Sequence, residues 1–145
     1  MNCDLCQREE LLIKGEYPYL LHEFKHSWWL LGEHQYYKGY SVLLVKGHYR
    51  ELTDLPVDTA QALFGELLVA HQSAQDFWGH HKMNLCSLGN VVDHLHWHLF
   101  PRYKDDPKLK NPPWLQMQDF DTKKISPSEA KEIILNWQKT FAFKG

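Results

Sequence analysis

The stretch HLHWHLF at residues 94–100 alternates histidine with apolar residues. Successive side chains of a β-strand point to opposite faces, so the alternation predicts a strand with His94, His96 and His98 in one row. The apolar residues that would anchor the opposite face are Leu95, Trp97 and Leu99. Imidazole rings must be hydrogen-bonded or solvated, and we therefore expect the histidine face to line a cleft. Pro101 is expected to end the strand, because proline cannot donate to a ladder.

Four further stretches that precede the histidine row have a composition that favours strands. They are rich in aromatic and apolar residues and span residues 17–24, 27–31, 39–46 and 83–88. The first three follow one another closely, as in an antiparallel meander.

Two helices are predicted from other signals. Apolar residues recur at spacings of three and four over residues 56–78, which indicates one main amphipathic helix that ends at Gly79. Ser126, Pro127 and Glu129 match a capping box with proline at the first helical position, which predicts a short C-terminal helix to about residue 140. The sequence therefore predicts an α+β fold in which an antiparallel sheet carries one main helix.

The length of 145 residues suits one domain with a single core. We expect a single domain over residues 1–145, with a core at about 3–103 and a C-terminal extension at about 104–145. Residues 102–124 contain three prolines and several charges, which predicts a long surface excursion. Trp114 in this excursion would cover a site or pack on a partner subunit.

The composition argues for a globular protein without a large charged surface. Hydrophobic residues make up 43% of the chain, and 16 basic against 18 acidic residues give a formal charge of −2. Broad binding to nucleic acid or to a membrane surface is therefore not expected. The N-terminus does not read as a secretory signal, and the longest apolar runs are too short to span a bilayer. We expect a cytoplasmic protein.

A row of histidines suits two kinds of chemistry. Histidines two apart on a strand can share a zinc ion with a ligand from elsewhere. Alternatively, a neutral imidazole can attack phosphorus and form a covalent intermediate, if its neighbours fix its tautomer and donate hydrogen bonds to the phosphate oxygens. A histidine-rich edge strand without a role is the third interpretation.

Residues 94–100 resemble the motif of the histidine triad (HIT) family, in which three histidines alternate with apolar residues. The resemblance extends over roughly residues 3–102 and includes the strand that leads to His48, the amphipathic helix and the Gly89-Asn90 turn. It implies a compact α+β fold, usually a homodimer, and hydrolysis or transfer at nucleotide α-phosphates without an organic cofactor. The resemblance is closest to bacterial members described as diadenosine-tetraphosphate-hydrolase-like.

The resemblance also implies roles for individual residues. His96, in the middle of the triad, would be the nucleophile, and His94 would orient it. His98 would hydrogen-bond the phosphate and help to protonate the leaving group. Asn90 matches a polar position near the scissile phosphate, and Asn84 is a second candidate for the same pocket.

One position departs from the family pattern. Many members carry a further histidine where this chain has Tyr40, after Gly39. A phenol there changes the surroundings of the nucleophile and the expected choice of leaving group, but it leaves His96 in place. Glu33 lies near the region where the family has an acidic ribose-binding residue, and we expect it to bind substrate.

The N-terminal pair Cys3 and Cys6 has the spacing of two soft metal ligands. In part of the family a similar pair joins two histidines in a zinc site, and the matching positions here are His48 and His94. The resemblance thus implies a structural zinc, whereas the alternative is a reduced thiol pair on a frayed terminus. Cys86 is expected to be an ordinary small core residue.

Two functional alternatives stay open beside catalysis through His96. The first is a non-catalytic module that binds purine nucleotides, which the departure at Tyr40 motivates. The second is a zinc-dependent hydrolase that uses His94, His96 and His98 as ligands of a metal-bound water. The cysteine pair argues against the second alternative, because it offers zinc a better site elsewhere.

Overall fold

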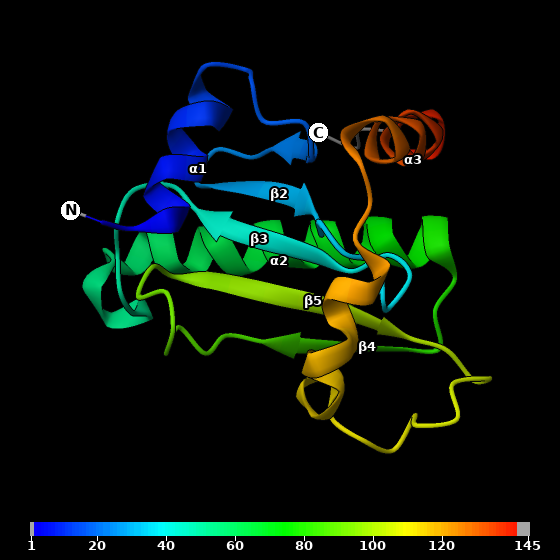
Figure 1. Cartoon of the computed structure of the whole chain (residues 1–145). Coiled ribbons are helices and arrows are strands. Elements are labelled where there is room, and N and C mark those ends of the chain that lie inside the picture. The colour runs from blue at the N-terminus through cyan, green and yellow to red at the C-terminus, as the bar shows by residue number, and fades with distance from the viewer. Residues whose placement is uncertain (1, 142–145) are drawn as a thin grey trace.

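A computed structural model describes residues 2–141 and shows a five-stranded sheet in which all neighbouring strands are antiparallel (Figure 1). In sheet order the strands are β1 (Leu20–Glu23), β2 (Ser27–Leu31), β3 (Ser41–Val45), β5 (His96–Arg102) and β4 (Lys82–Cys86). This architecture confirms the predicted α+β fold. Among residues 2–141, no helix combines the length and the apolar character that crossing a membrane requires.

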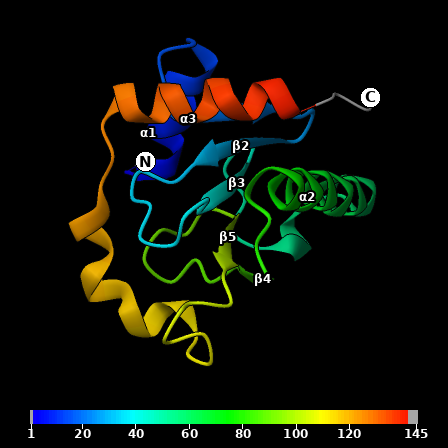
Figure 2. The same ribbon diagram turned by 90° about the vertical axis from the view of Figure 1, so that its right-hand side faces the viewer.

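Helix α2 (Val57–Trp78) packs on one face of the sheet (Figures 1 and 2). Its buried residues recur with the helical period, and Gly79 ends it in a left-handed conformation with φ 62°. The buried helix residues are Leu63, Leu67, Ala70, Ser73 and Ala74. The apolar residues among them form the main core together with sheet residues such as Trp29, Leu43 and Leu99.

Helix α3 (Pro127–Thr140) begins at the predicted capping box, in which Ser126 and Glu129 bond to each other's backbone N–H groups. Its Trp137 lies edge-on to Trp29 with ring centroids 5.2 Å apart. The indole of Trp137 donates to the Ser73 hydroxyl on α2 at 2.9 Å. These contacts join α3 to the core, although α3 is distant in sequence from both β2 and α2.

Helix α1 (Asp4–Ile13), which the sequence analysis did not predict, packs on the opposite face of the sheet (Figure 1). Cys3 caps it by accepting a hydrogen bond from the Cys6 backbone N–H. Only Leu5 and Leu12 of the helix are buried. A helix with so few buried residues has a weak periodic signal, and the helix was not predicted for this reason. The alternative of a frayed terminus around the cysteine pair is wrong.

The histidine strand starts later and ends later than predicted. Strand β5 begins at His96, so His94 lies two residues before it. The strand also runs through Pro101 to Arg102. Pairing with β3 stops at Leu99, so β4 alone continues beside Pro101, and a residue without an N–H group is tolerated there.

The region predicted as a surface excursion, residues 102–124, is only partly one. It contains the 3₁₀ helix η2 (Pro113–Lys123), whose Phe120 is buried against the histidine-bearing face of the sheet. Ile125 donates its N–H to the carbonyl of Glu33, which fixes the end of this segment. Arg102 is 2% exposed and donates to Asp106 and to two backbone carbonyls, which fixes its start. The prediction failed because the contacts of Phe120 and Ile125 are with residues distant in sequence.

Candidate functional site

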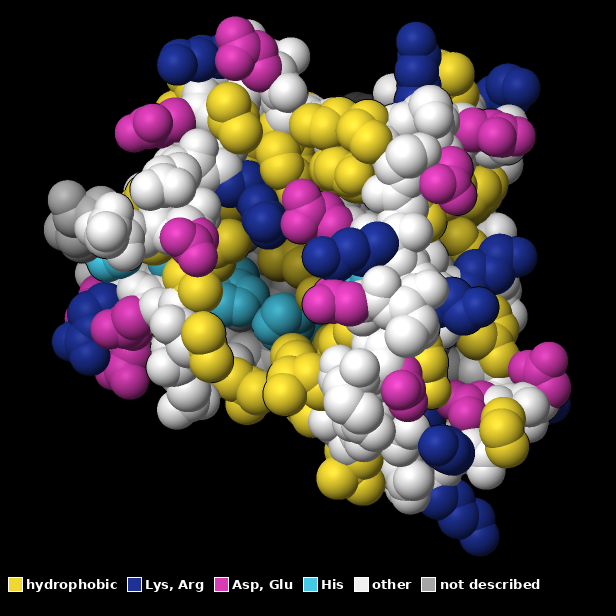
Figure 3. Space-filling view, in the orientation of Figure 1, with side chains coloured by type: hydrophobic (Ala, Val, Ile, Leu, Met, Phe, Trp, Pro, Cys, Tyr) yellow, Lys and Arg dark blue, Asp and Glu magenta, His cyan; other side chains and the backbone are white. Residues whose placement is uncertain are grey.

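Histidine side chains gather in a hollow on the face of the sheet that α2 leaves uncovered (Figure 3). In the same orientation, Figure 1 shows α1 on one side of this region and η2 on the other. His96 and His98 project from β5, with Cα partners on β3 at Leu44 and Val42. Both rings are enclosed, since His96 is 8% exposed and His98 is half-buried. Two of the three predicted histidines, His96 and His98, therefore share one face of the strand, whereas His94 precedes the strand and is buried beside the cysteines.

One backbone carbonyl determines the protonation pattern of His96. Its Nδ1 lies 2.6 Å from the carbonyl oxygen of His94, and a carbonyl can only accept. Nδ1 must therefore carry the hydrogen, which leaves the lone pair of a neutral ring on Nε2. Ser87 donates its hydroxyl to the carbonyl of His96 at 2.8 Å and holds the backbone at this point.

The same pattern continues through His98 to Tyr40. His98 Nε2 lies 3.1 Å from His96 Nε2, and the lone pair on His96 makes His98 the donor. His98 Nδ1 is then an acceptor, and it takes a 2.7 Å hydrogen bond from the Tyr40 hydroxyl. Tyr40 thus fixes the tautomer of His98. The sequence singles out Tyr40 as a departure from the pattern of the resemblance but does not predict this bond.

The surroundings keep both histidines neutral. Burial lowers the pKa of His96 below its usual value, although its bond to the His94 carbonyl opposes the shift. Burial, together with the rings of His96 and His34, lowers the pKa of His98 to about 3. Burial raises the pKa of Tyr40, so the phenol stays protonated and remains a donor.

The ring of Tyr40 is tightly packed, and Gly32 leaves the space that it occupies. It stacks on Phe100 at 4.6 Å and on His34 at 4.5 Å between centroids. A Cβ atom added at Gly32 would lie 2.2 Å from Tyr40 Cδ2, far inside van der Waals contact. Trp114 on η2 is edge-on to His98 at 4.9 Å. Trp114 therefore packs beside the histidines of its own chain, in agreement with the predicted role of covering a site.

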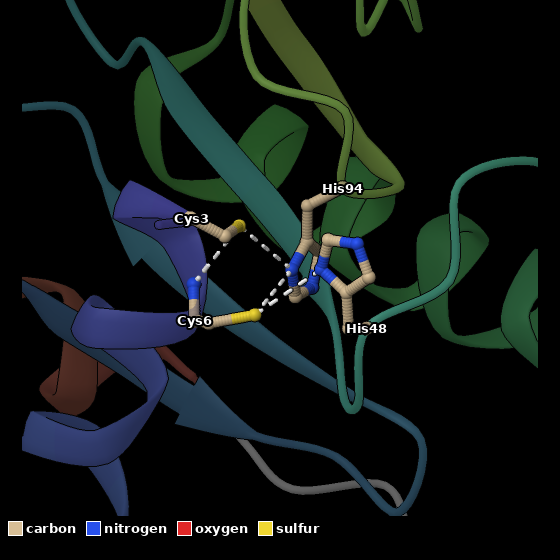
Figure 4. Close-up of side chains that lie close together, drawn as sticks. All are labelled: Cys3, Cys6, His48 and His94. Atoms are coloured by element: carbon tan, nitrogen blue, oxygen red, sulfur yellow. Dashed lines mark hydrogen bonds between the residues drawn. The ribbon is translucent and has the colours of Figure 1, made fainter. Parts of the chain in front are cut away.

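The second part of the site is a cluster of two cysteines and two histidines (Figure 4). Cys3 and Cys6 come from the start of α1, His48 from the loop after β3, and His94 from the turn before β5. Their ligand atoms all lie within 4.8 Å of one another. The Cys6 sulfur is 3.2 Å from His48 Nδ1 and 3.5 Å from His94 Nδ1. The structure thus brings together all four residues that the resemblance implied as zinc ligands.

The donor atoms of this cluster fit a tetrahedral zinc ion. With bonds of about 2.3 Å to sulfur and 2.0–2.1 Å to nitrogen, tetrahedral ligand atoms lie roughly 3.3–3.8 Å apart. His94 Nε2 donates to the Val45 carbonyl at 2.9 Å, which leaves the Nδ1 lone pair toward the sulfurs. Burial and the Cys3 side chain raise the pKa of Cys6 to about 11, so a cation is needed to hold it as a thiolate.

Sharing of one zinc by the three triad histidines receives no support from this geometry. His94 faces the cysteines, whereas His96 uses Nδ1 for a backbone carbonyl. Among residues 2–141, the cysteine–histidine cluster is the one group with three or more ligands placed for a metal.

The predicted substrate-binding residues lie in different surroundings. Glu33 borders a small cavity with Tyr40 and Arg8, and accepts hydrogen bonds from Arg8 and Tyr17. Asn90 is exposed in the turn before the triad. Asn84 accepts a 3.0 Å hydrogen bond from Arg102, which gives it a structural partner. Half-buried Cys86 packs at the edge of the aromatic cluster around Phe100, consistent with an ordinary packing residue.

Comparisons with known proteins agree with this geometry. The sequence model of the HIT domain matches residues 18–105. A histidine triad protein from Bradyrhizobium japonicum superposes with a TM-score of 0.71 at 19% identity, over 85% of this chain and 90% of that chain. One from Marinobacter aquaeolei gives 0.62 at 25% identity, over 84% and 90%. A Zn-bound histidine triad family protein from Mycobacterium smegmatis gives 0.65 at 18% identity, over 96% and 95%. The comparison with curated proteins found no match.

Proposed function

Because the chain belongs to the HIT domain family, we propose that it releases or transfers a nucleoside monophosphate from an adenylylated substrate, with His96 as nucleophile. The observation that carries this proposal is the hydrogen bond from His96 Nδ1 to the His94 carbonyl. It leaves a lone pair on His96 Nε2 within the enclosed hollow. A neutral, oriented imidazole is what attack on phosphorus requires.

The proposed reaction has two steps. His96 Nε2 forms a bond to the α-phosphorus, and the bond from phosphorus to the leaving group breaks with its electron pair. His98 Nε2–H, which bonds to His96 Nε2 in the structure, donates a hydrogen bond to the departing oxygen and keeps its proton. The leaving group departs as an anion and takes any proton from solvent. Water then attacks phosphorus and its proton passes to solvent, and His96 is released as a neutral ring together with the nucleoside monophosphate.

We propose dinucleoside polyphosphates such as diadenosine tetraphosphate as the first substrate class to test. Wild-type protein is incubated with diadenosine tetraphosphate and, separately, with an adenosine phosphoramidate, and AMP release is followed. A rapid acid quench should trap an adenylylated protein, with the adduct on His96. Release of AMP with this adduct supports the proposal. AMP binding without turnover or adduct would instead favour the non-catalytic binding module.

We predict that Tyr40→Phe lowers kcat about 10- to 100-fold with little change in KM, because His98 Nδ1 loses the donor that fixes its tautomer. The aromatic stack on Phe100 and His34 stays intact in this variant. The matched control is Tyr37→Phe, since the Tyr37 hydroxyl is buried in the same aromatic cluster without a hydrogen-bond partner. Equal activity of the two variants would contradict the assigned role of Tyr40.

We further propose that Cys3, Cys6, His48 and His94 hold a structural zinc ion. Two observations support this proposal: the four donors converge on one point, and the ring nitrogen of His94 that faces them is the unprotonated one. When bound, the ion would tie α1 to the turn before β5. The turn it fixes includes the carbonyl that orients His96.

We also propose that the chain forms a homodimer through α2 and the edge strand β4. Apolar side chains are unusually exposed here, with Phe64 at 51%, Leu68 at 67% and Leu85 at 43%. Leu85 pairs with Leu99, whose side chain lies on the α2 side of the sheet, so strand and helix present one surface. An unpaired strand edge beside an apolar helix face is suited to contact with a second copy.

Leu68→Glu should convert the dimer to a monomer, because it places a charge at the centre of the apolar surface. Light scattering after size-exclusion chromatography measures the mass of each species. Leu135→Glu on α3, where the side chain is 48% exposed outside this surface, is the matched control and should keep the mass of the wild type. A monomeric wild-type protein would overturn the dimer proposal.

A further inference from the structure

An ion pair between α1 and the turn after β2 borders a small cavity next to Tyr40. Arg8 Nη2 lies 3.4 Å from Glu33 Oε2, and the guanidinium is 5.4 Å from the centre of the Tyr17 ring. The Tyr17 hydroxyl donates to the same carboxylate at 3.4 Å. The remaining lining comes from Leu30, Leu31, Gly32, His34, Tyr40 and Val42.

This cavity is too small for a nucleoside. Its volume is about 100 Å³, whereas small-molecule sites in proteins usually hold about 300–1,000 Å³. The ion pair at its border is weakly held, because the side chains of Arg8 and Glu33 are 28% and 47% exposed and the hydrogen bonds to Glu33 from Arg8 and Tyr17 are both 3.4 Å long. Exposed ion pairs of this kind contribute little stability, so a ligand can open this one at small cost.

Arg8 is also connected to the triad histidines through Tyr40. It lines the same cavity as Tyr40, whose hydroxyl bonds His98. Figure 3 shows basic and acidic side chains together at the rim of the hollow, beside the histidines.

We propose that Arg8 is a phosphate-binding residue of this site: it leaves Glu33 when a nucleotide enters and binds a nonbridging oxygen of the phosphate held at His96. Planar guanidinium groups suit phosphate oxygens, and the exchange replaces one anionic partner with another. Glu33, once released, is free to accept the ribose hydroxyls. This inference rests on the proposed function, and it adds a residue that neither the histidine motif nor the family resemblance pointed to.

The test compares dissociation constants for AMP and for adenosine, which lacks the phosphate, by calorimetry. The wild type should bind AMP more tightly than adenosine. In Arg8→Met, AMP should bind about tenfold or more weakly while adenosine binds as before, because a charge-assisted hydrogen bond is lost. Arg8→Lys should recover part of the difference. Arg50→Met is the matched control, since Arg50 pairs with Asp93 on the surface.

Each outcome separates this inference from the proposal on which it rests. If Arg8→Met leaves AMP binding unchanged, or weakens AMP and adenosine equally, Arg8 has only a structural role and the inference fails. If the wild type binds neither compound, the proposed function fails and the inference with it. If Arg8→Met does not fold, the same dissociation constants are measured for Glu33→Gln. This variant frees Arg8 from its partner, so it should raise the preference for AMP over adenosine. An unchanged preference would overturn the inference.

Discussion

His96→Ala is expected to reduce AMP release from diadenosine tetraphosphate by a factor on the order of 10⁴ or more. The nucleophile takes part in every turnover, and loss of a nucleophile in other enzymes leaves only the catalysis that binding and electrostatics supply. The adenylylated protein should no longer form after acid quench. Initial rates and mass spectrometry of the quenched protein measure the two effects.

Two controls make the result specific to His96. His81→Ala removes an exposed histidine outside the hollow and should keep the wild-type rate. His96→Ala itself should still bind AMP and melt cooperatively, because the ring belongs to the hollow and the main core on the other face of the sheet is untouched. Wild-type turnover by a folded His96→Ala protein would show that another group attacks phosphorus.

The strand that carries the histidines could be predicted because its signal is local. Alternation over residues 94–100 is a property of neighbouring residues, and the sheet satisfies it over most of this length. Helix α1 could not be predicted in this way. Its first turn is capped by a cysteine and only two of its residues are buried, so neither a usual cap nor a periodic stripe marks it.

The features of the candidate site also differ in whether local sequence could predict them. The row of His96 and His98 follows from strand periodicity alone. The bond from Tyr40 to His98 joins residues 58 positions apart, and no spacing rule gives its length or direction. Gly32 carries a related signal, because a Cβ atom at this position would collide with the ring of Tyr40. Such a signal can be understood only when the register of β2 and β3 is known.

Metal removal is expected to have the largest effect on stability. If the four-residue cluster holds zinc at a free concentration about 1,000 times its dissociation constant, binding stabilises the fold by about 4 kcal/mol. For a chain of this size, the loss should lower Tm by roughly 10 °C. The cluster joins α1 to the turn before β5, and few other contacts of α1 are buried. Its loss should therefore release α1 first, which hydrogen exchange can follow.

The measurement combines metal analysis with thermal unfolding. Wild-type protein should contain about one zinc per chain, and a strong chelator should lower its Tm. Cys3→Ser should already have the lower Tm and show no further response to the chelator. Cys86→Ser removes the one thiol outside the cluster and should behave as wild type.

Catalysis should respond to the same treatment without direct participation of the metal. The carbonyl that orients His96 belongs to His94, whose ring is one of the four ligands. Release of this ring lets the carbonyl move, and kcat should fall while the chain remains folded below its new Tm. A chelator that removes zinc but changes neither Tm nor kcat would show that the protein core alone holds the turn. A wild-type protein that takes up no zinc would overturn the metal site itself.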